Sequence, residues 1–206
     1  RSYREYFNIY MVYAFSQESG ITYVDNKVVT RFETKILSAT STHMITNSLL
    51  CKIYSQKVPL INPEMTNVIL VANKNHYAGT CFMNSNGSFV AICPLSPLSY
   101  PYDFRGVVQH EAGGHGFGQL GDEYIKYTGM VPASEVDNLR MYQEYGMFLN
   151  VDATSDRSAI LWKHFFSDPV YSYVGAYDGG YYYPQGIWRP ESGSLMINNI
   201  RYINAP

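Results

Sequence analysis

One segment, residues 110–124, constrains this chain more than any other, and it reads His-Glu-Ala-Gly-Gly-His-Gly-Phe-Gly-Gln-Leu-Gly-Asp-Glu-Tyr. Zinc hydrolases with the pattern His-Glu-x-x-His place both imidazoles on one helical face, with the glutamate beside the activated water. Here His110 and His115 are five positions apart instead of four. On a regular α-helix five residues turn the chain by about 500°, which leaves the rings roughly 140° apart. A regular helix would therefore keep the two rings from binding one metal.

A π-type turn between the two histidines removes this conflict. With i→i+5 hydrogen bonding the fifth residue returns near the same face, and such turns recur at functional sites. Gly113 and Gly114 lie between the histidines, where they weaken a regular helix by about 1 kcal/mol each relative to alanine and ease an irregular turn. The extra residue and the glycines together predict that His110 and His115 are ligands of one metal ion.

The third ligand is expected from Asp122 or Glu123. Gly118 follows His115 by three residues, as a helix-ending glycine does, so the chain can turn back toward the metal. Either carboxylate suits zinc, and we favour Asp122, which lies nearer the position of the third ligand in related sites. The other carboxylate would then orient a ligating histidine.

Two neighbouring residues have predicted catalytic roles. Glu111 is the expected general base, which takes a proton from water that zinc has made more acidic. Tyr124 can donate its phenol to the developing oxyanion, and a packing role fits it equally well. Two imidazoles and a carboxylate with an open position make one Zn²⁺ the default cofactor.

The bulk composition is that of a globular domain without a nucleic-acid or membrane signature. The 206 residues are 46% hydrophobic and carry a formal net charge of −2, which gives no electrostatic reason to expect nucleic acid as a partner. No apolar run approaches the roughly 20 residues that span a bilayer, so no membrane insertion is expected. We predict one domain over residues 1–206, with an N-terminal lobe of about 1–120 and a C-terminal lobe of about 121–206.

The local patterns predict an α+β fold. Before the histidine helix they indicate a strand, a helix, a second strand and a hairpin, over residues 6–15, 40–56, 68–72 and 79–93. Asp103 is expected to cap the histidine helix, which runs from Phe104 to about Phe117. This order fits a mixed sheet with one backing helix and an active-site helix above a cleft.

The C-terminal part is expected to form an irregular subdomain. Helices are predicted over 134–148 and 157–166, and loops or short strands over the Tyr-, Gly- and Pro-rich stretch 169–190. Within the hairpin, Cys81 and Cys93 lie symmetrically about Gly87, so they would face each other. The pattern is compatible with a disulfide between these two cysteines and equally with two buried free thiols.

The segment 110–124 closely resembles the IgA peptidases and their relatives, a family of secreted bacterial metallopeptidases (metallopeptidase family sixty-four). Their usual motif is His-Glu-x-Gly-His, a small-residue turn and Leu-Ala-Asp-Glu-Tyr. This chain matches the ending from Gly116 to Tyr124, with Gly121 in place of alanine, and departs by one extra residue before His115. Similar landmarks are Phe7-Asn8, Ser16–Gly20, Val29–Phe32, Asn67–Val71 and Trp188–Met196.

This resemblance implies a zincin/metzincin-like fold and a zinc-dependent endopeptidase, secreted or at the bacterial cell surface, that acts on an extracellular protein or peptide substrate. Met196 resembles the methionine of the turn beneath a metzincin metal, with a plain core methionine as the alternative. The peptide would lie along the edge of the 77–93 hairpin, opposite a wall formed by residues 171–183.

Two alternative functions are also compatible with the sequence. One is a secreted glycan- or protein-binding module with a structural or vestigial metal site, which the 20 tyrosines favour. The other is an amidase or another zinc hydrolase that acts on a non-protein substrate. A base placed next to a metal ligand argues against the binding module.

Overall fold

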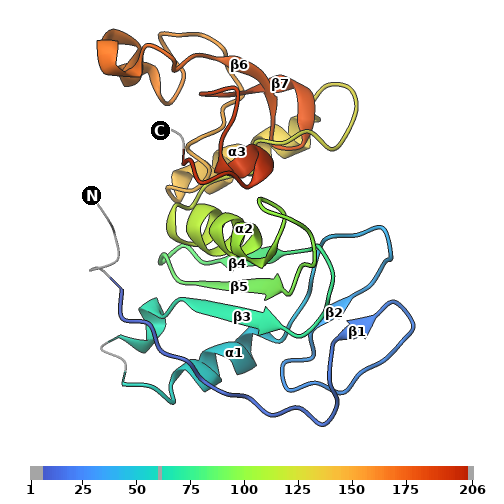
Figure 1. Cartoon of the computed structure of the whole chain (residues 1–206). Helices are drawn as coiled ribbons and strands as arrows, with labels where there is room; N and C mark the ends of the chain where they lie inside the picture. The colour runs from blue at the N-terminus through green and yellow to red at the C-terminus, as the bar shows by residue number, and fades with distance from the viewer. Residues whose placement is uncertain (1–6, 60–61, 204–206) are drawn as a thin grey trace.

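A three-stranded sheet and the helix that packs on it position the predicted site. The computed structural model describes residues 7–59 and 62–203 and has a mixed α+β architecture (Figure 1). β5 (Phe89–Pro94) is central, parallel to β3 (Val68–Ala72) and antiparallel to β4 (Thr80–Met83). All six residues of β5 are buried, as expected for an apolar strand that is covered on both faces.

The helix on this sheet changes its winding halfway along. α2 (Phe104–Val108) is an α-helix, and Asp103 caps it as predicted by accepting a hydrogen bond from Gly106 N at 3.1 Å. The chain continues without a break into the π-helix η3 (Gln109–Phe117), which contacts both β5 and β4. The predicted π-turn is therefore confirmed, and it extends over nine residues.

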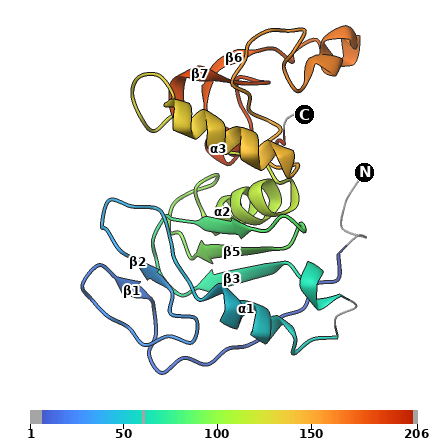
Figure 2. The same ribbon diagram turned by 180° about the vertical axis from the view of Figure 1, so that it is seen from behind.

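Smaller elements surround this framework. On the sheet side they are the parallel pair β1 (Thr22–Tyr23) and β2 (Lys35–Ile36), the helix α1 (Ser48–Ser55), and a 3₁₀ turn at Pro63–Met65. After the π-helix come α3 (Ala133–Glu144), 3₁₀ turns at Lys163–Ser167 and Pro169–Tyr171, the hairpin β6 (Tyr177–Gly180) and β7 (Tyr183–Arg189), and α4 (Leu195–Asn198). Figure 1 shows the helix between the sheet and these C-terminal elements, and Figure 2 shows the same order from behind.

Two glycine-dependent contacts let the π-helix fit between its neighbours. A Cβ on Gly114 would overlap Sδ of Met196, which is fully buried in α4. On the side of the sheet, a Cβ on Gly116 would lie 2.7 Å from the ring of Phe89. Gly113, in contrast, has no atom within 4 Å of its Cβ position. Gly114 therefore serves close packing against Met196, in addition to easing the turn.

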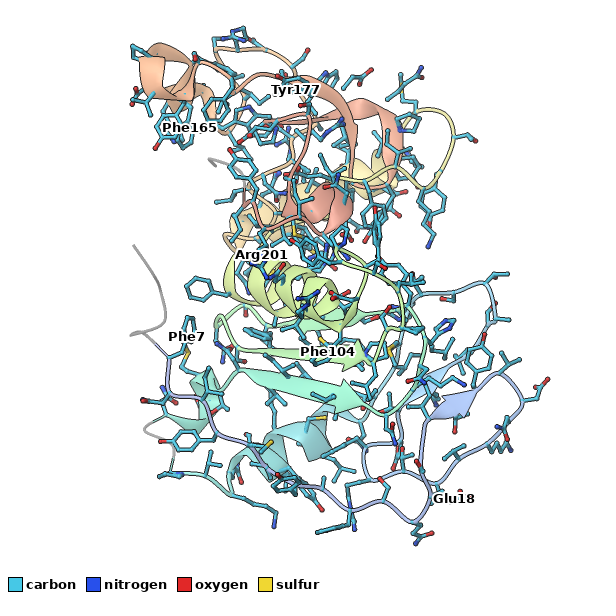
Figure 3. All side chains as sticks on the ribbon, in the orientation of Figure 1. Phe7, Glu18, Phe104, Phe165, Tyr177 and Arg201 are labelled. Atoms are coloured by element: carbon cyan, nitrogen blue, oxygen red, sulfur yellow. The ribbon has the colours of Figure 1, made fainter. Side chains whose placement is uncertain are left out.

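The predicted strand over residues 6–15 is wrong for the part that the structure describes. Residues 7–15 are extended but pair with no strand, and four of their side chains stay 73–89% exposed, those of Ile9, Met11, Tyr13 and Phe15. Figure 3 shows the chain passing along the outside of the sheet half from Phe7 to Glu18. Residue 6 lies outside the described residues. A β-type sequence forms a strand only beside a hydrogen-bonding partner.

Two helix predictions need new boundaries and one is wrong. The helix over 40–56 begins only at Ser48, because Asn47 caps it by accepting from Leu50 N at 3.1 Å. The helix over 134–148 ends at Glu144, before two positive-φ residues, Gly146 and Phe148. Residues 157–166 form turns and part of a 3₁₀ helix, because the Asp156 side chain binds the backbone of Ser158 in competition with a helix. The short strands expected within 169–190 are present.

The hairpin 79–93 is confirmed, but its cysteines do not face each other. Cys81 pairs with Ala91, because the hairpin is centred one residue earlier than Gly87. All three cysteines are free thiols, so the disulfide is wrong; of the two thiols in the alternative, Cys93 is buried as expected and Cys81 is only half-buried. In the described parts of the chain, no helix is long and apolar enough to cross a membrane.

Alanine substitutions at the two central glycines should separate close packing from helix propensity. Gly114→Ala is expected to destabilise the fold by about 1–3 kcal/mol, because the added methyl group meets the enclosed Met196 side chain. Gly113→Ala is the matched control and should be neutral or stabilising by up to about 1 kcal/mol. Urea unfolding of both variants measures the difference, and equal stabilities would contradict this packing.

Candidate metal centre

The three side chains favoured as metal ligands meet beside the π-helix. His110, His115 and Asp122 each offer one ligand atom, and these atoms all lie within 4.8 Å of one another. The two rings share a helical face, with centroids 4.8 Å apart. Asp122 approaches from the segment after the helix, so that its Oδ1 lies 3.0 Å from Nε2 of His110 and 3.3 Å from Nε2 of His115. All three residues are more than nine-tenths buried.

Each imidazole faces acceptor oxygens at both of its nitrogens. Nδ1 of His110 lies 3.1 Å from the carbonyl oxygen of Leu195, and Nδ1 of His115 lies 2.7 Å from that of Leu120. A neutral imidazole has one N–H and carbonyl oxygens only accept, so Nδ1 donates in both rings. Each Nε2 then directs a lone pair toward Asp122, which is unfavourable unless a proton or a cation lies between them. This convergence of lone pairs is the signature of a cation site.

The donor set and its spacing fit zinc. Zinc–nitrogen distances near 2.0–2.1 Å at tetrahedral angles put neighbouring ligand atoms roughly 3.3 Å apart. The two distances from Asp122 Oδ1, 3.0 and 3.3 Å, are close to this value. Two imidazoles and one carboxylate also leave a fourth position open, as in catalytic zinc sites. The three residues could therefore hold a metal ion with an open coordination position.

In the metal-free protein, His115 and Asp122 stabilise each other's charges. Burial opposes the charged form of His115, but the Asp122 carboxylate and its hydrogen bond outweigh burial and raise the pKa of His115 to about 9. Burial likewise acts against the carboxylate, yet the charge of His115 and the contacts of Asp122 with both rings hold the pKa of Asp122 well below its usual range. A metal ion must therefore displace a proton from His115.

Glu111 lies beside the ligands with an unused acceptor. It is buried, and its Oε2 has no hydrogen-bond partner among the described residues. Burial raises the pKa of Glu111, although His110 and His115 oppose this shift. Gly79 lies just before β4, and a Cβ at its position would overlap Oε1 of Glu111. Because glycine has no side chain, it leaves room for the Glu111 carboxylate. A buried, unpartnered carboxylate next to a cation site is suited to accept a proton.

His110 and Glu111 line a cavity of about 340 Å³, within the size range of ligand sites. Its walls include His110 and Glu111 from the helix and Tyr124 from the segment that follows. Burial and the nearby Asp122 raise the pKa of the Tyr124 phenol, which therefore remains a hydrogen-bond donor at neutral pH. The remaining lining is mostly uncharged and includes two more tyrosines, Tyr77 and Tyr102, together with Lys126.

Glu123 is not part of the ligand group. Its Oε1 accepts from Asn150 Nδ2 and its Oε2 from Ser194 Oγ, both at 2.7 Å, and its amide donates to Met196 O at 3.0 Å. Glu123 thus ties the segment after the π-helix to the turn that contains Met196. The predicted orienting role of the second carboxylate is wrong, because backbone carbonyls orient both histidines. Nothing in the sequence pattern singled out Asn150, whose partner is 27 residues away.

Tyr182 is a site residue that sequence reasoning placed only within a general tyrosine-rich wall. Its hydroxyl donates to Oδ2 of Asp122 at 2.5 Å. Gly118 ends the helix as predicted, with a φ of −78°, and the left-handed conformation falls on the next residue, Gln119, with φ 52°.

No protein-family model matches the chain, and no curated protein matches it at a significant level of similarity. The resemblance to the IgA peptidases therefore stays a prediction that rests on the motif residues.

Metal content should depend on the five-residue histidine spacing. Purified protein supplied with zinc is expected to hold about one ion per chain, because the described residues contain one group of three converging ligands. His115→Ala should lose that ion, whereas His164→Ala, outside the site, should keep it. Mass spectrometry of bound metal checks both variants, and equal zinc content in them would contradict the assignment.

Zinc binding should become tighter as pH rises toward 9. His115 holds its proton below a pKa of about 9 in the metal-free protein, and binding must remove that proton. The apparent affinity should therefore increase by up to about tenfold per pH unit between about pH 6 and about pH 8. Competition with a chelator of known pH dependence measures this slope, and a flat profile would contradict the release of a proton from His115 on metal binding.

Proposed function

We propose that this chain is the catalytic domain of a zinc-dependent endopeptidase that hydrolyses peptide bonds in extracellular protein substrates. One observation carries the proposal: Glu111, which lines the cavity, has an unpartnered carboxylate oxygen beside three converging ligand groups. A structural metal site has no need for an adjacent, unused base. The motif resemblance supports a zincin/metzincin-like enzyme related to the IgA peptidases, secreted or at the bacterial cell surface.

Each residue of the site has a distinct role in the proposed hydrolysis. A zinc ion held by His110, His115 and Asp122 supplies a Lewis acid that polarises the scissile carbonyl and acidifies water. Glu111 takes a proton from the attacking water and passes it to the leaving amine. Its raised pKa, caused by burial, brings it closer to the value that suits both steps. The Tyr124 phenol donates a hydrogen bond to the oxyanion.

The substrate peptide lies along the free edge of β4. β4 is an edge strand of the three-stranded sheet, and Gly79 at its start lines the cavity beside Glu111. An extended peptide that pairs with this edge would bring one carbonyl into the cavity that His110 and Glu111 line. The tyrosine-rich residues 171–183 then face the peptide from the C-terminal half.

Replacing the general base should separate hydrolysis from metal binding. Glu111→Gln is expected to lower peptide hydrolysis by at least about 100-fold, because the amide cannot accept the proton, and to leave zinc content unchanged. Glu144→Gln, at the exposed end of α3, is the matched control and should keep full activity. Cleavage of a peptide library, followed by mass spectrometry, measures the rates.

The same assay distinguishes the other functions. A zinc-loaded wild-type protein that cleaves no peptide but binds glycans or proteins would indicate a binding module. Hydrolysis of small amides without peptide cleavage would indicate an amidase. Unchanged peptide cleavage by Glu111→Gln would remove Glu111 from the mechanism.

A further inference from the structure

The turn between β6 and β7 has a backbone conformation that its two residues disfavour. Gly180 pairs with Tyr183, which leaves Tyr181 and Tyr182 as a two-residue turn. Both have positive φ angles, 47° and 73°, as a type I′ turn requires. Asparagine and glycine are the usual residues in such a turn, because other side chains are strained there. Two consecutive tyrosines in this conformation call for a compensating contact.

The backbone of this turn binds the segment that carries the third ligand. Tyr181 N donates to the carbonyl oxygen of Asp122 at 2.8 Å, and Tyr182 N donates to that of Tyr124 at 3.1 Å. The carbonyl oxygen of Tyr182 in turn accepts from Lys126 N at 2.9 Å. The backbone of Asp122 is therefore fixed by the turn and not by its own helix, which ends at Phe117.

The two tyrosine side chains of the turn make different contacts. The Tyr181 ring is buried in the core that includes Phe148, with ring centroids 6.0 Å apart, and so anchors the turn. The Tyr182 hydroxyl donates to Oδ2 of Asp122 at 2.5 Å. The other carboxylate oxygen, Oδ1, is the one that faces both histidines. The two carboxylate oxygens of Asp122 therefore have different partners: Oδ1 faces the histidines and Oδ2 accepts the hydrogen bond from Tyr182.

We infer that the Tyr181-Tyr182 turn is a strained clamp that sets the geometry of the metal site, with Tyr182 as a positioning residue for Asp122. The hydrogen bond on Oδ2 fixes the rotation of the carboxylate, so that Oδ1 alone is presented to the metal. An asparagine-glycine pair would relax the backbone but supply neither the anchor nor the hydroxyl. This inference rests on the proposed metal site, and it adds a residue that neither the ligand motif nor the spacing identified.

Removing one hydroxyl should weaken metal binding. Tyr182→Phe keeps the ring and the turn but frees Oδ2, so the zinc dissociation constant is expected to rise 10- to 100-fold, the usual loss when a group that orients a ligand is removed. Tyr181→Phe, which changes the neighbouring residue of the same turn, is the matched control and should bind zinc as the wild type does. Competition with a chromophoric chelator measures the dissociation constants, and thermal unfolding of the metal-free proteins reports their folding.

Each result bears on the clamp. Weaker zinc binding by Tyr182→Phe, with Tyr181→Phe unchanged, supports it. Equal zinc affinity in Tyr182→Phe and wild type overturns it, even if the metal-free variant unfolds at a lower temperature, because that pattern indicates a structural role alone. A wild-type protein that binds no zinc overturns the metal site and the clamp together. A wild-type protein that binds zinc but cleaves no peptide overturns the peptidase proposal, while the zinc affinities still decide the clamp.

Discussion

The i→i+5 hydrogen bonding of residues 109–117 is the constraint on which the rest of the site depends. It returns His115 to the face of His110, where a regular helix would separate the rings. A wider helix needs close neighbours to hold it, and here the sheet contacts one side while Met196 contacts the other. At Gly114 and Gly116 a Cβ would overlap Met196 and Phe89, so these two glycines allow the close packing. The irregular winding is therefore stabilised by tertiary packing on two sides.

Asp122 connects the two halves of the structure at the metal centre. Its Oδ1 faces histidines from the helix that packs on the sheet, whereas its Oδ2 and its backbone carbonyl bind a turn from the C-terminal hairpin. Glu123 extends this connection through Asn150 and Ser194. Because the C-terminal half supplies these contacts, the third ligand is positioned only when both halves are packed together. Local sequence around the histidines determines two ligands, and tertiary contacts position the third.

Several elements were predicted correctly from local sequence patterns, because local interactions determine them. Asp103 caps its helix through an amide three residues away, and the apolar, β-branched run 68–72 forms a strand as predicted, although its Ile69 and Val71 side chains stay about half exposed. The segments that failed depend on partners elsewhere. Residues 7–15 have a strand-type sequence but no pairing strand, and the register of the hairpin places Cys81 opposite Ala91 through the length of its loop. Pattern alone contains no information on such partners.

The sequence by itself determined the chemistry of the candidate site: the two histidines, the adjacent glutamate, the carboxylate pair and the π-turn that their five-residue spacing requires. Those features lie within 15 consecutive residues, so helical geometry relates them directly. Only the tertiary structure decided which carboxylate faces the histidines, which carbonyls orient their rings, and that Tyr182 holds Asp122. Those contacts join residues up to 85 positions apart, and the packing of the two halves, not any local periodicity, brings them together.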